Sequence, residues 1–420
     1  MAKLRFPENF FWGVATSSHQ VEGGNRNNWT EWEKRNARRL AHEAKSKYGE
    51  TSIWSKIKNK AAKPDNYISG KACCHHTMYE EDFDLMQSLE INSYRFSIEW
   101  SRVQPEKGIF NEEALKHYEK VIDALLRRNI TPFVTLWHTA LPIWVENEKG
   151  WESPKTIGYF CRYAEKVAER MKGKVKFWIT INEPMVYAAA SYLKGVWPPQ
   201  KKSPLSSLNV VKNIISAQKK VFRILKKTDR SSKIGVANHL LHFNKLDDTL
   251  VSSLLELILG KWLWNDYFIS KTKDYVDFIG VNYYDCFNIK YGFIDHEISR
   301  FMQLRWNPHP DGIKEVLRSL KKYNKPIYIT ENGFIQLGGK SKDTARVEYI
   351  KKIIKSISES IKDGSDIRGY FYWSLFDNFE WEKGFWPTLG LVSIDYANMK
   401  RKKRLSAMEY SKIIKSAKEK

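Results

Sequence analysis

Cysteine is scarce in this sequence, which has four, Cys73, Cys74, Cys161 and Cys286, among 420 residues. So few cysteines in so long a chain do not form the dense disulfide framework of small secreted domains. Cys73 and Cys74 are adjacent and lack the CxxC spacing of a zinc site, although His75 and His76 follow them. We therefore expect reduced structural thiols, with no metal and no other cofactor.

Long apolar runs are also missing. No stretch approaches the roughly 18 apolar residues that a membrane-spanning helix needs. The N-terminal MAKLRFPENFFWG lacks an apolar segment behind a basic start, which a secretory signal would have. The sequence contains no internal repeat or low-complexity linker. We expect a cytoplasmic protein whose residues 1–420 form one catalytic domain; the sequence does not indicate its oligomeric state.

Acidic residues are too few to balance the basic ones, since 48 Asp and Glu face 70 Lys and Arg, giving a net charge of +22. A basic surface can attract nucleic acid or anionic lipid. We find neither zinc-finger spacing nor the consensus of an RNA-binding sheet, so we expect no nucleic-acid partner. The excess is concentrated in residues 33–63, with ten Lys and Arg against three Glu, and in Lys400–Arg404.

Short β-favouring apolar runs alternate with amphipathic helical patterns, as in parallel βαβ units. One predicted helix follows a cap at Asn111. Another is predicted to open with Ser153 as its cap and Pro154 at the first helical position, and to reach about Met171. The predicted strands are Phe10–Thr16, Ser93–Ile98, Pro132–Leu136, Phe177–Ile181, Ile234–Asn238, Phe278–Asn282, Ile327–Thr330 and Gly369–Trp373. Eight strands with helical crossovers, and no Gly-rich phosphate loop, favour an α/β fold of the (β/α)₈ TIM-barrel class over a doubly wound sheet.

Polar and aromatic residues occur in or just beyond most of these strands. In a (β/α)₈ barrel all C-terminal strand ends open onto one face, so residues that are scattered in sequence converge there. Polar groups that bind hydroxyls, next to aromatic rings, are suited to binding a sugar. The residues concerned are Gln20, Arg95, His138, Asn182, Glu183, Asn282, Tyr284, Glu331, Asn332, Trp373 and Glu380.

Glu183, in ITINEP, and Glu331, in YITENG, each follow a predicted strand directly. Opposed carboxylates are the reacting groups of glycoside hydrolysis, one protonating the leaving oxygen and the other attacking the anomeric carbon. If Arg95 and Tyr284 lie beside Glu331, they favour its anion, while burial and the charge of Glu331 favour a protonated Glu183. Asn182 is placed to hydrogen-bond the 2-hydroxyl of the sugar.

The sequence resembles glycoside hydrolase family 1, which contains β-glucosidases and β-galactosidases. The resemblance spans essentially the whole chain. The segments that carry it are FPENFFWGVATSSHQVEG, SYRFSIEWSRVQP, TLWHTALPIW, TINEP, GVNYY, YITENG, GYFYWSLFDNFEW and LGLVSIDY.

The resemblance implies a retaining β-glycosidase that releases terminal β-linked glucosyl or galactosyl residues from small β-glycosides or oligosaccharides. Glu183 would be the acid/base and Glu331 the nucleophile, with carboxyl groups about 5–5.5 Å apart. Arg95, Asn282 and Tyr284 would support the nucleophile, Trp373 would stack on the sugar, and Trp306 would line the aglycone side. Hydroxyl ligands would be Gln20, His138, Asn182, Glu380 and Trp381. The alternatives are a 6-phospho-β-glycosidase, disfavoured because the Glu380 carboxylate would repel phosphate, and a sugar- or polyanion-binding pseudoenzyme.

Several positions depart from the family pattern. Thr139 and Ala140 replace a usual aromatic and Asp, and Thr388, Leu389 and Gly390 replace the usual Arg-Phe-Gly. Residues 33–63 look like an insertion in the loop after the first strand and include a predicted short basic helix that ends at Gly49. This insertion has three possible roles: an inert solvated surface, a lid over the aglycone channel with Tyr48 and Trp54 as contacts, or a dock for an anionic surface.

Overall fold

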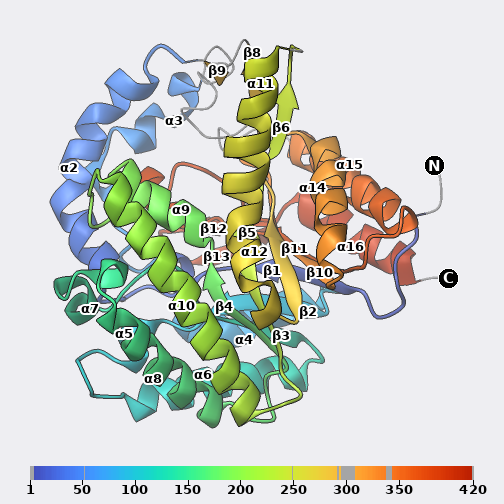
Figure 1. The fold of residues 1–420 in the computed structure, drawn as a ribbon. Coiled ribbons are helices and arrows are strands. Elements are labelled where there is room, and N and C mark those ends of the chain that lie inside the picture. The colour runs from blue at the N-terminus through green and yellow to red at the C-terminus, as the bar shows by residue number, and fades with distance from the viewer. Residues whose placement is uncertain are drawn as a thin grey trace.

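The computed structural model describes residues 4–51, 53–247, 249–290, 293–294, 308–336 and 343–418. Eight parallel strands close into a barrel in the order β1-β2-β3-β4-β5-β7-β10-β11 (Figure 1). They are β1 Phe11–Ala15, β2 Ser93–Ser97, β3 Thr131–Trp137, β4 Phe177–Asn182, β5 Lys233–His239, β7 Phe278–Asn282, β10 Ile327–Asn332 and β11 Ile367–Trp373. Each matches one predicted run to within two residues at either end, so the (β/α)₈ prediction is confirmed.

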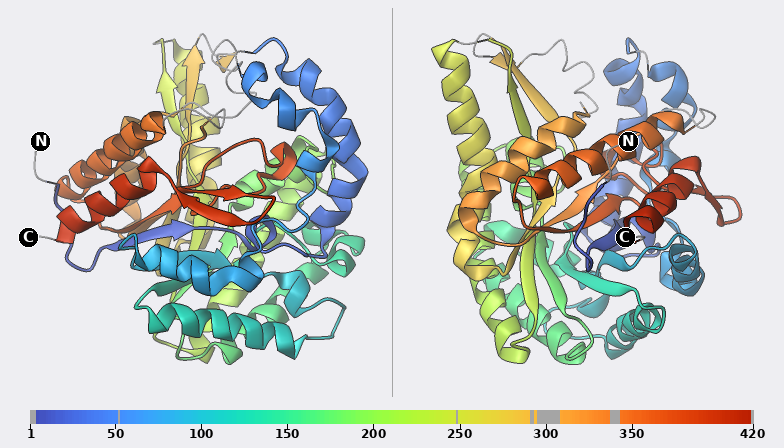
Figure 2. Two further views of the ribbon diagram at one scale, coloured as in Figure 1. Left: turned by 180° about the vertical axis from the view of Figure 1, so that it is seen from behind. Right: turned by 90° about the vertical axis from the view of Figure 1, so that its right-hand side faces the viewer.

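Helices on the outside of the barrel connect successive strands, and a final helix, α16, follows the last barrel strand (Figures 1 and 2). They are α4 His75–Gln87, α6 Glu112–Arg127, α8 Lys155–Arg170, α10 Pro204–Thr228, α12 Tyr267–Thr272, α14 Ile313–Leu320, α15 Thr344–Lys362 and α16 Leu405–Lys418. Asn111 caps α6 as predicted, because its side-chain oxygen accepts a hydrogen bond from the Ala114 N–H at 3.1 Å. The predicted side-chain cap at Ser153 is wrong. Helix α8 begins at Lys155, and it is the backbone carbonyl of Ser153 that accepts from the Thr156 N–H.

Shorter elements make up the loops. The α-helices among them are α1 Ser18–Val21, α2 Asn28–Tyr48, α3 Trp54–Ala61, α5 Trp100–Val103, α7 Ile143–Asn147, α9 Pro184–Ala188 and α11 Leu250–Leu255, and the π-helices are η3 Ala189–Leu193 and η4 Glu256–Asp266. The 3₁₀ turns are η1 Pro64–Tyr67, η2 Gly150–Glu152, η5 Lys273–Tyr275, η6 Pro310–Gly312, η7 Lys321–Tyr323 and η8 Trp381–Lys383. Two small sheets consist of β6 His242–Lys245, β8 Cys286–Lys290 and β9 Phe293–Ile294, and of β12 Val392–Asp395 and β13 Lys400–Lys403.

Aromatic side chains fill the barrel near the N-terminal ends of its strands. The rings of Phe133 and Phe177 stack with centroids 4.3 Å apart, and Phe11 and Tyr328 pack against them. Gly13 has no room for a side chain, because a Cβ there would lie 2.3 Å from the Phe371 ring. This packed floor leaves the C-terminal end of the barrel as the place for a site, as expected for the fold.

The basic segment 33–63 lies in the connection between β1 and β2. Its helix α2 is longer than predicted, starting at Asn28, although it ends at Tyr48 with Gly49 in the cap position as expected. The segment is packed onto the barrel loops through buried apolar residues. Tyr48, Ile53 and Ile57 are buried with Trp386, and the rings of Tyr48 and Trp386 lie 5.7 Å apart.

None of the helices in the described ranges combines the length and the apolar character needed to cross a bilayer.

Candidate active site

Glu331 lies at the end of β10, where two donors hold its carboxyl group. Arg95, from β2, forms an ion pair with Oε1, and the Tyr284 hydroxyl donates to Oε2 at 2.7 Å. The Arg95 guanidinium also donates to the Thr330 carbonyl oxygen at 3.1 Å. Arg95 is completely buried and Glu331 is 4% exposed, so the carboxyl group is fixed in a site largely closed to solvent.

Glu183 follows β4 and adopts a left-handed backbone conformation, with φ of 45°. This conformation is rare for a residue with a side chain, and such residues are concentrated at functional sites. The Asn282 side-chain amide donates to Glu183 Oε1 at 2.8 Å. The sequence predicts Asn282 as a support of Glu331. In the described contacts its amide nitrogen donates to Glu183 and to Asn182 Oδ1.

Asn182 links the two strand ends. Its Oδ1 accepts from Arg95 at 2.6 Å and from Asn282 at 3.1 Å. Because both neighbours are donors, the orientation of the amide is determined, and Nδ2 donates to His138 Nε2 at 3.1 Å. This contact requires a His138 Nε2 without a proton. Burial and the nearby Arg95 charge lower the pKa of His138 well below its usual value, which favours the neutral ring.

The protonation of the two carboxyl groups depends on their surroundings. Burial raises the pKa of Glu183, against the opposing effects of Asn282 and Arg95. Burial likewise raises the pKa of Glu331 to about 7; Arg95 and the Tyr284 hydrogen bond lower it, and the Glu183 charge raises it. Arg95 and Tyr284 therefore act on Glu331 in the predicted direction, but burial outweighs them. Since only Glu331 has both a paired cation and a hydroxyl donor, the anion is favoured there and the shared proton on Glu183.

The loop after β11 supplies a further wall, with Glu380 and Trp381. Gln20, from α1, lies behind this wall and donates to the Phe379 carbonyl oxygen at 2.8 Å and to Glu380 at 3.3 Å. Burial raises the pKa of Glu380 to about 8. Trp381 stacks on His19 with centroids 5.5 Å apart, and Trp373 stacks on His138 with centroids 5.7 Å apart.

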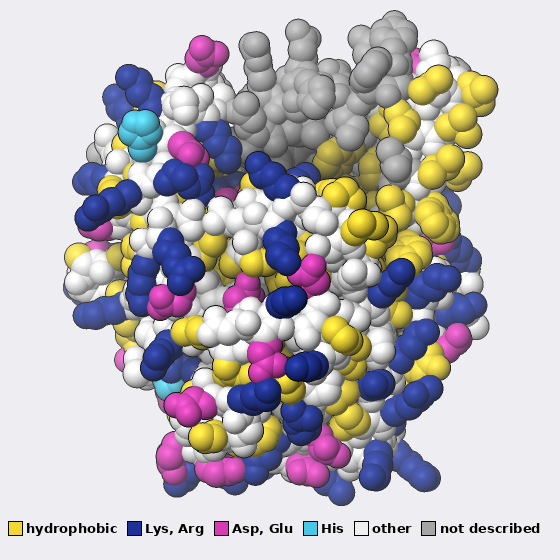
Figure 3. Space-filling view, turned by 60° about the vertical axis from the view of Figure 1, so that its left-hand side comes forward, with side chains coloured by type: hydrophobic (Ala, Val, Ile, Leu, Met, Phe, Trp, Pro, Cys, Tyr) yellow, Lys and Arg dark blue, Asp and Glu magenta, His cyan; other side chains and the backbone are white. Residues whose placement is uncertain are grey.

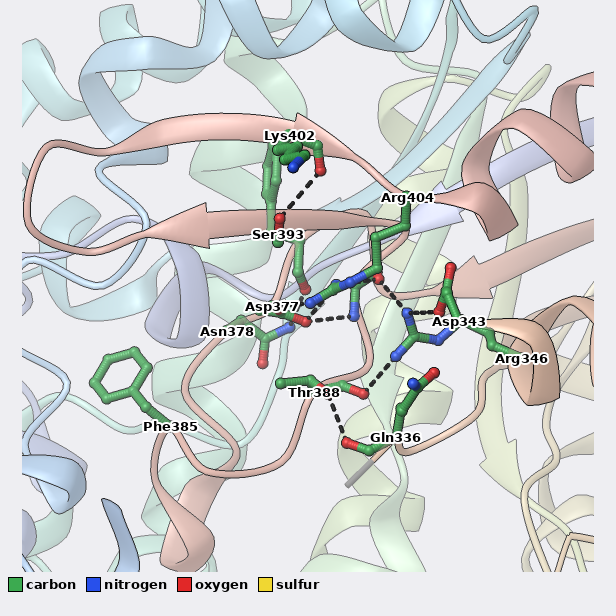
Figure 4. A network of polar contacts seen from close by, with 12 residues as sticks. Gln336, Asp343, Arg346, Asp377, Asn378, Phe385, Thr388, Ser393, Lys402 and Arg404 are labelled. Atoms are coloured by element: carbon green, nitrogen blue, oxygen red, sulfur yellow. Dashed lines mark hydrogen bonds and ion pairs between the residues drawn. The ribbon is translucent and has the colours of Figure 1, made fainter. Parts of the chain in front are cut away.

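A polar network fixes the base of this loop (Figure 4). Arg346 bonds the carbonyl oxygens of Thr388 and Gly390 at 2.7 and 2.9 Å. Arg404 bonds the Gly390 carbonyl at 2.6 Å and pairs with Asp377 at 2.5 Å. These arginines come from α15 and from the residue before α16. They hold both ends of the segment that carries Glu380 and Trp381.

A cavity of about 470 Å³ brings most of the predicted residues together. His138, Asn182, Glu183, Tyr284, Glu331, Trp373, Glu380 and Trp381 line it. Arg95, Asn282 and Gln20 support lining residues from behind. Trp306 lies outside the described residues. Sequence reasoning did not find Lys194, Trp197, His239, Trp264, Glu382 and Lys383, which also line the cavity.

The sequence profile described as "Glycosyl hydrolase family 1" matches residues 2–250 and 265–419. The chain belongs to glycosyl hydrolase family 1.

Relatives of this family 1 glycosidase cover nearly its whole length. A "1,4-beta-D-glucan glucohydrolase" of Thermotoga neapolitana and "Beta-glucosidase A" of Thermotoga maritima are each 31% identical to it, over 98% of both chains. The solved structure of a beta-glycosidase from Pyrococcus horikoshii is 34% identical, with a TM-score of 0.84, and the match covers 99% of this chain and 96% of the other. A beta-glucosidase from Thermotoga maritima, solved in complex with deoxynojirimycin, is 28% identical with a TM-score of 0.81, covering 99% of each chain.

Two departures of this glycosidase from the family pattern lie in the cavity wall. Thr139 and Leu389 both line the cavity. Ala140 is buried with Trp29, Trp197 and Trp381. The small side chain that replaces the usual Asp is therefore covered by tryptophans, and this part of the wall is closed.

Proposed function

We propose that this family 1 enzyme is a retaining β-glycosidase that hydrolyses terminal β-linked glucosyl or galactosyl residues. The observation that carries the proposal is the pair of carboxyl groups at the ends of β4 and β10, which line one cavity but have different partners. Glu331 has the cation and the hydroxyl donor that a nucleophilic anion needs. Glu183 has one amide donor and a pKa raised by burial, as suits a general acid.

In the first step, Glu183 would protonate the glycosidic oxygen while Glu331 attacks the anomeric carbon. This forms a glycosyl ester on Glu331 and releases the aglycone. The charge of Glu331 is then lost, which favours ionisation of Glu183. As a base, Glu183 would take a proton from water, which attacks the anomeric carbon, releases the sugar with its original configuration and restores Glu331.

The neighbouring residues would position the sugar. Asn182 Oδ1 already accepts from Arg95 and Asn282, and one N–H of its amide is given to His138. Its second N–H can donate to the 2-hydroxyl, as the sequence analysis expected. Glu380 and the stacked rings of Trp373 and Trp381 would hold the remaining hydroxyls and the apolar face of the sugar.

Chemical rescue tests the two roles separately. Glu331→Ala should abolish turnover, and azide should restore part of it with inversion, since azide replaces the nucleophile. Glu183→Ala should still cleave activated nitrophenyl glycosides, and azide should then give a product of retained configuration. Glu146→Gln is the control, because burial also raises the pKa of Glu146 but this residue does not line the cavity. Rescue products of exchanged configuration would exclude this assignment.

A 6-phospho-β-glycosidase is the second candidate, because Lys194 and Lys383 line the cavity and could attract phosphate. Lys383, however, is paired with Glu382 at 2.9 Å, and Glu382 also accepts from the Trp197 indole at 2.6 Å. We expect nitrophenyl β-glucoside or β-galactoside to have a higher kcat/KM than its 6-phospho form. A binding-only role is disfavoured, because both carboxyl groups are present in the cavity.

A further inference from the structure

A small apolar platform stands beside the carboxyl groups, on one side of the barrel mouth. It consists of β6, β8, α11 and η4, which Figures 1 and 2 show extending away from the barrel. Strands β6 and β8 pair in parallel, with Phe243 opposite Phe287. Both rings line the same cavity as Glu183 and Glu331, so the site continues onto the platform.

The part of the cavity wall formed by these four elements offers few polar groups. Its larger side chains are Phe243, Leu255, Trp264, Phe287 and Ile289, and the other contributors are Gly260 and Cys286. None of them carries a charge, an amide or a hydroxyl group. A second sugar would need several hydrogen-bond partners for its hydroxyls, whereas a hydrocarbon chain needs none.

The helical side of the platform is built for close contact with the sheet. A Cβ on Gly260 would lie 2.7 Å from the Phe243 ring, so the absence of a side chain allows η4 to pack directly on that ring. The outer sides of α11 and η4 also carry apolar side chains. Leu254, Leu257, Ile258 and Trp262 are exposed by 45 to 58%, and Figure 3 shows hydrophobic side chains along this edge, at the upper right. The family profile matches residues up to 250 and from 265, so residues 251–264, which form most of α11 and η4, lie outside the shared family pattern.

We infer that the platform binds the apolar aglycone of the substrate, and that alkyl β-glycosides are the substrate class it selects. The inference rests on the proposed function, because the chain must be attached to a sugar held at Glu183 and Glu331. The alkyl chain would leave the anomeric carbon and lie along the apolar wall that these four elements contribute to the cavity.

The experiment compares methyl, butyl, hexyl and octyl β-glucosides below the concentrations at which they form micelles. Removing one methylene group from water favours binding by about fourfold. We expect kcat/KM to rise two- to fourfold per added methylene until the chain reaches the end of the platform. Cellobiose should be hydrolysed less efficiently than octyl glucoside.

Two substitutions, at positions two residues apart, test whether the dependence of kcat/KM on chain length arises in the cavity wall. Leu255→Asn introduces an amide into the cavity wall and should flatten the dependence on chain length, while hydrolysis of methyl glucoside is retained. Leu257→Asn is the matched control, because Leu257 is 58% exposed and does not line the cavity, and the dependence should persist. If nitrophenyl glucoside is hydrolysed but kcat/KM does not change with chain length, the platform inference fails alone. If no glucoside or galactoside is hydrolysed, the proposed function fails. Equal loss of the chain-length dependence in both variants would also overturn the inference.

Discussion

Replacement of Tyr284 by Phe tests the proposal that Glu331 is held as an anionic nucleophile. The change removes the hydroxyl that donates to Glu331 Oε2 at 2.7 Å and leaves the ring in place. A hydrogen bond to a charged group contributes about 1.5–3 kcal/mol, and 1.36 kcal/mol corresponds to one pKa unit. Water that enters the gap would recover part of this energy, so we expect the pKa of Glu331 to rise by about one unit.

The sign of the effect on activity follows from the proposed role of Glu331 as an anionic nucleophile. Activity rises with pH as this group ionises, and its pKa is already raised to about 7. Loss of the donor stabilises the protonated form relative to the anion, so the acidic limb of the kcat/KM profile should move to higher pH. Relative to wild type, Tyr284→Phe should therefore lose about tenfold more activity on the acidic limb of the kcat/KM profile than on its plateau. Because the two glutamates titrate as a pair, the measured value belongs to the pair.

Tyr283 provides the matched control. It is the preceding residue, it is buried, and its hydroxyl donates to the His309 carbonyl oxygen at 2.7 Å instead of to Glu331. Tyr283→Phe should lower stability and leave the pH profile in place. The assay is kcat/KM for nitrophenyl β-glucoside between pH 4 and pH 9. An acidic limb that stays fixed in Tyr284→Phe, or that moves equally in both variants, would refute the reasoning.

Three further predictions concern stability and the rim. Burial raises the pKa of Glu380 to about 8, so its folded state binds more protons than the unfolded state between about pH 4.5 and pH 8, and stability should fall as the pH rises through this window. Glu380→Gln should therefore stabilise the protein at pH 8 relative to wild type and give no gain at pH 4, as thermal unfolding would show. Ile57→Ala should lower the free energy of unfolding by about 2–4 kcal/mol in urea titrations, because Ile57 is buried with Trp386 of the loop after β11, whereas exposed Ile258→Ala should change it little. Replacing residues 37–62 by a Gly/Ser linker should change aglycone preference if the insertion is a lid; substrate preferences identical to wild type would leave the segment without that role.

The sequence predicted best those elements that a single physical constraint determines. A buried parallel strand needs a continuous apolar run, and all eight such runs became barrel strands. Arg95, Asn182 and Glu331 could be grouped because the fold itself brings strand ends together. Lys194, Trp197 and Trp264 could not be grouped in this way, since they lie on loops whose path depends on tertiary packing. The hydrogen-bond partner of Asn282 could not be predicted either. The strand ends bring both Glu183 and Glu331 close to Asn282, and only the side-chain geometry shows that its amide bonds Glu183.

The contact between His19 and Glu33 has a consequence for how this enzyme can be redesigned. Glu33 is a buried acidic residue of α2; it bonds His19 at 2.8 Å and accepts from the Ser69 N–H and hydroxyl, both at 2.8 Å. His19 in turn stacks on Trp381. The start of the insertion is thus joined to the wall of the cavity that contains Glu183 and Glu331, and the two must be exchanged together in any chimera with a relative. A graft that replaces only residues between Asn36 and Ser69 would keep the contacts of Glu33 with His19 and Ser69. Beyond Asn36, the exposed positions can differ in charge and the segment can differ in length.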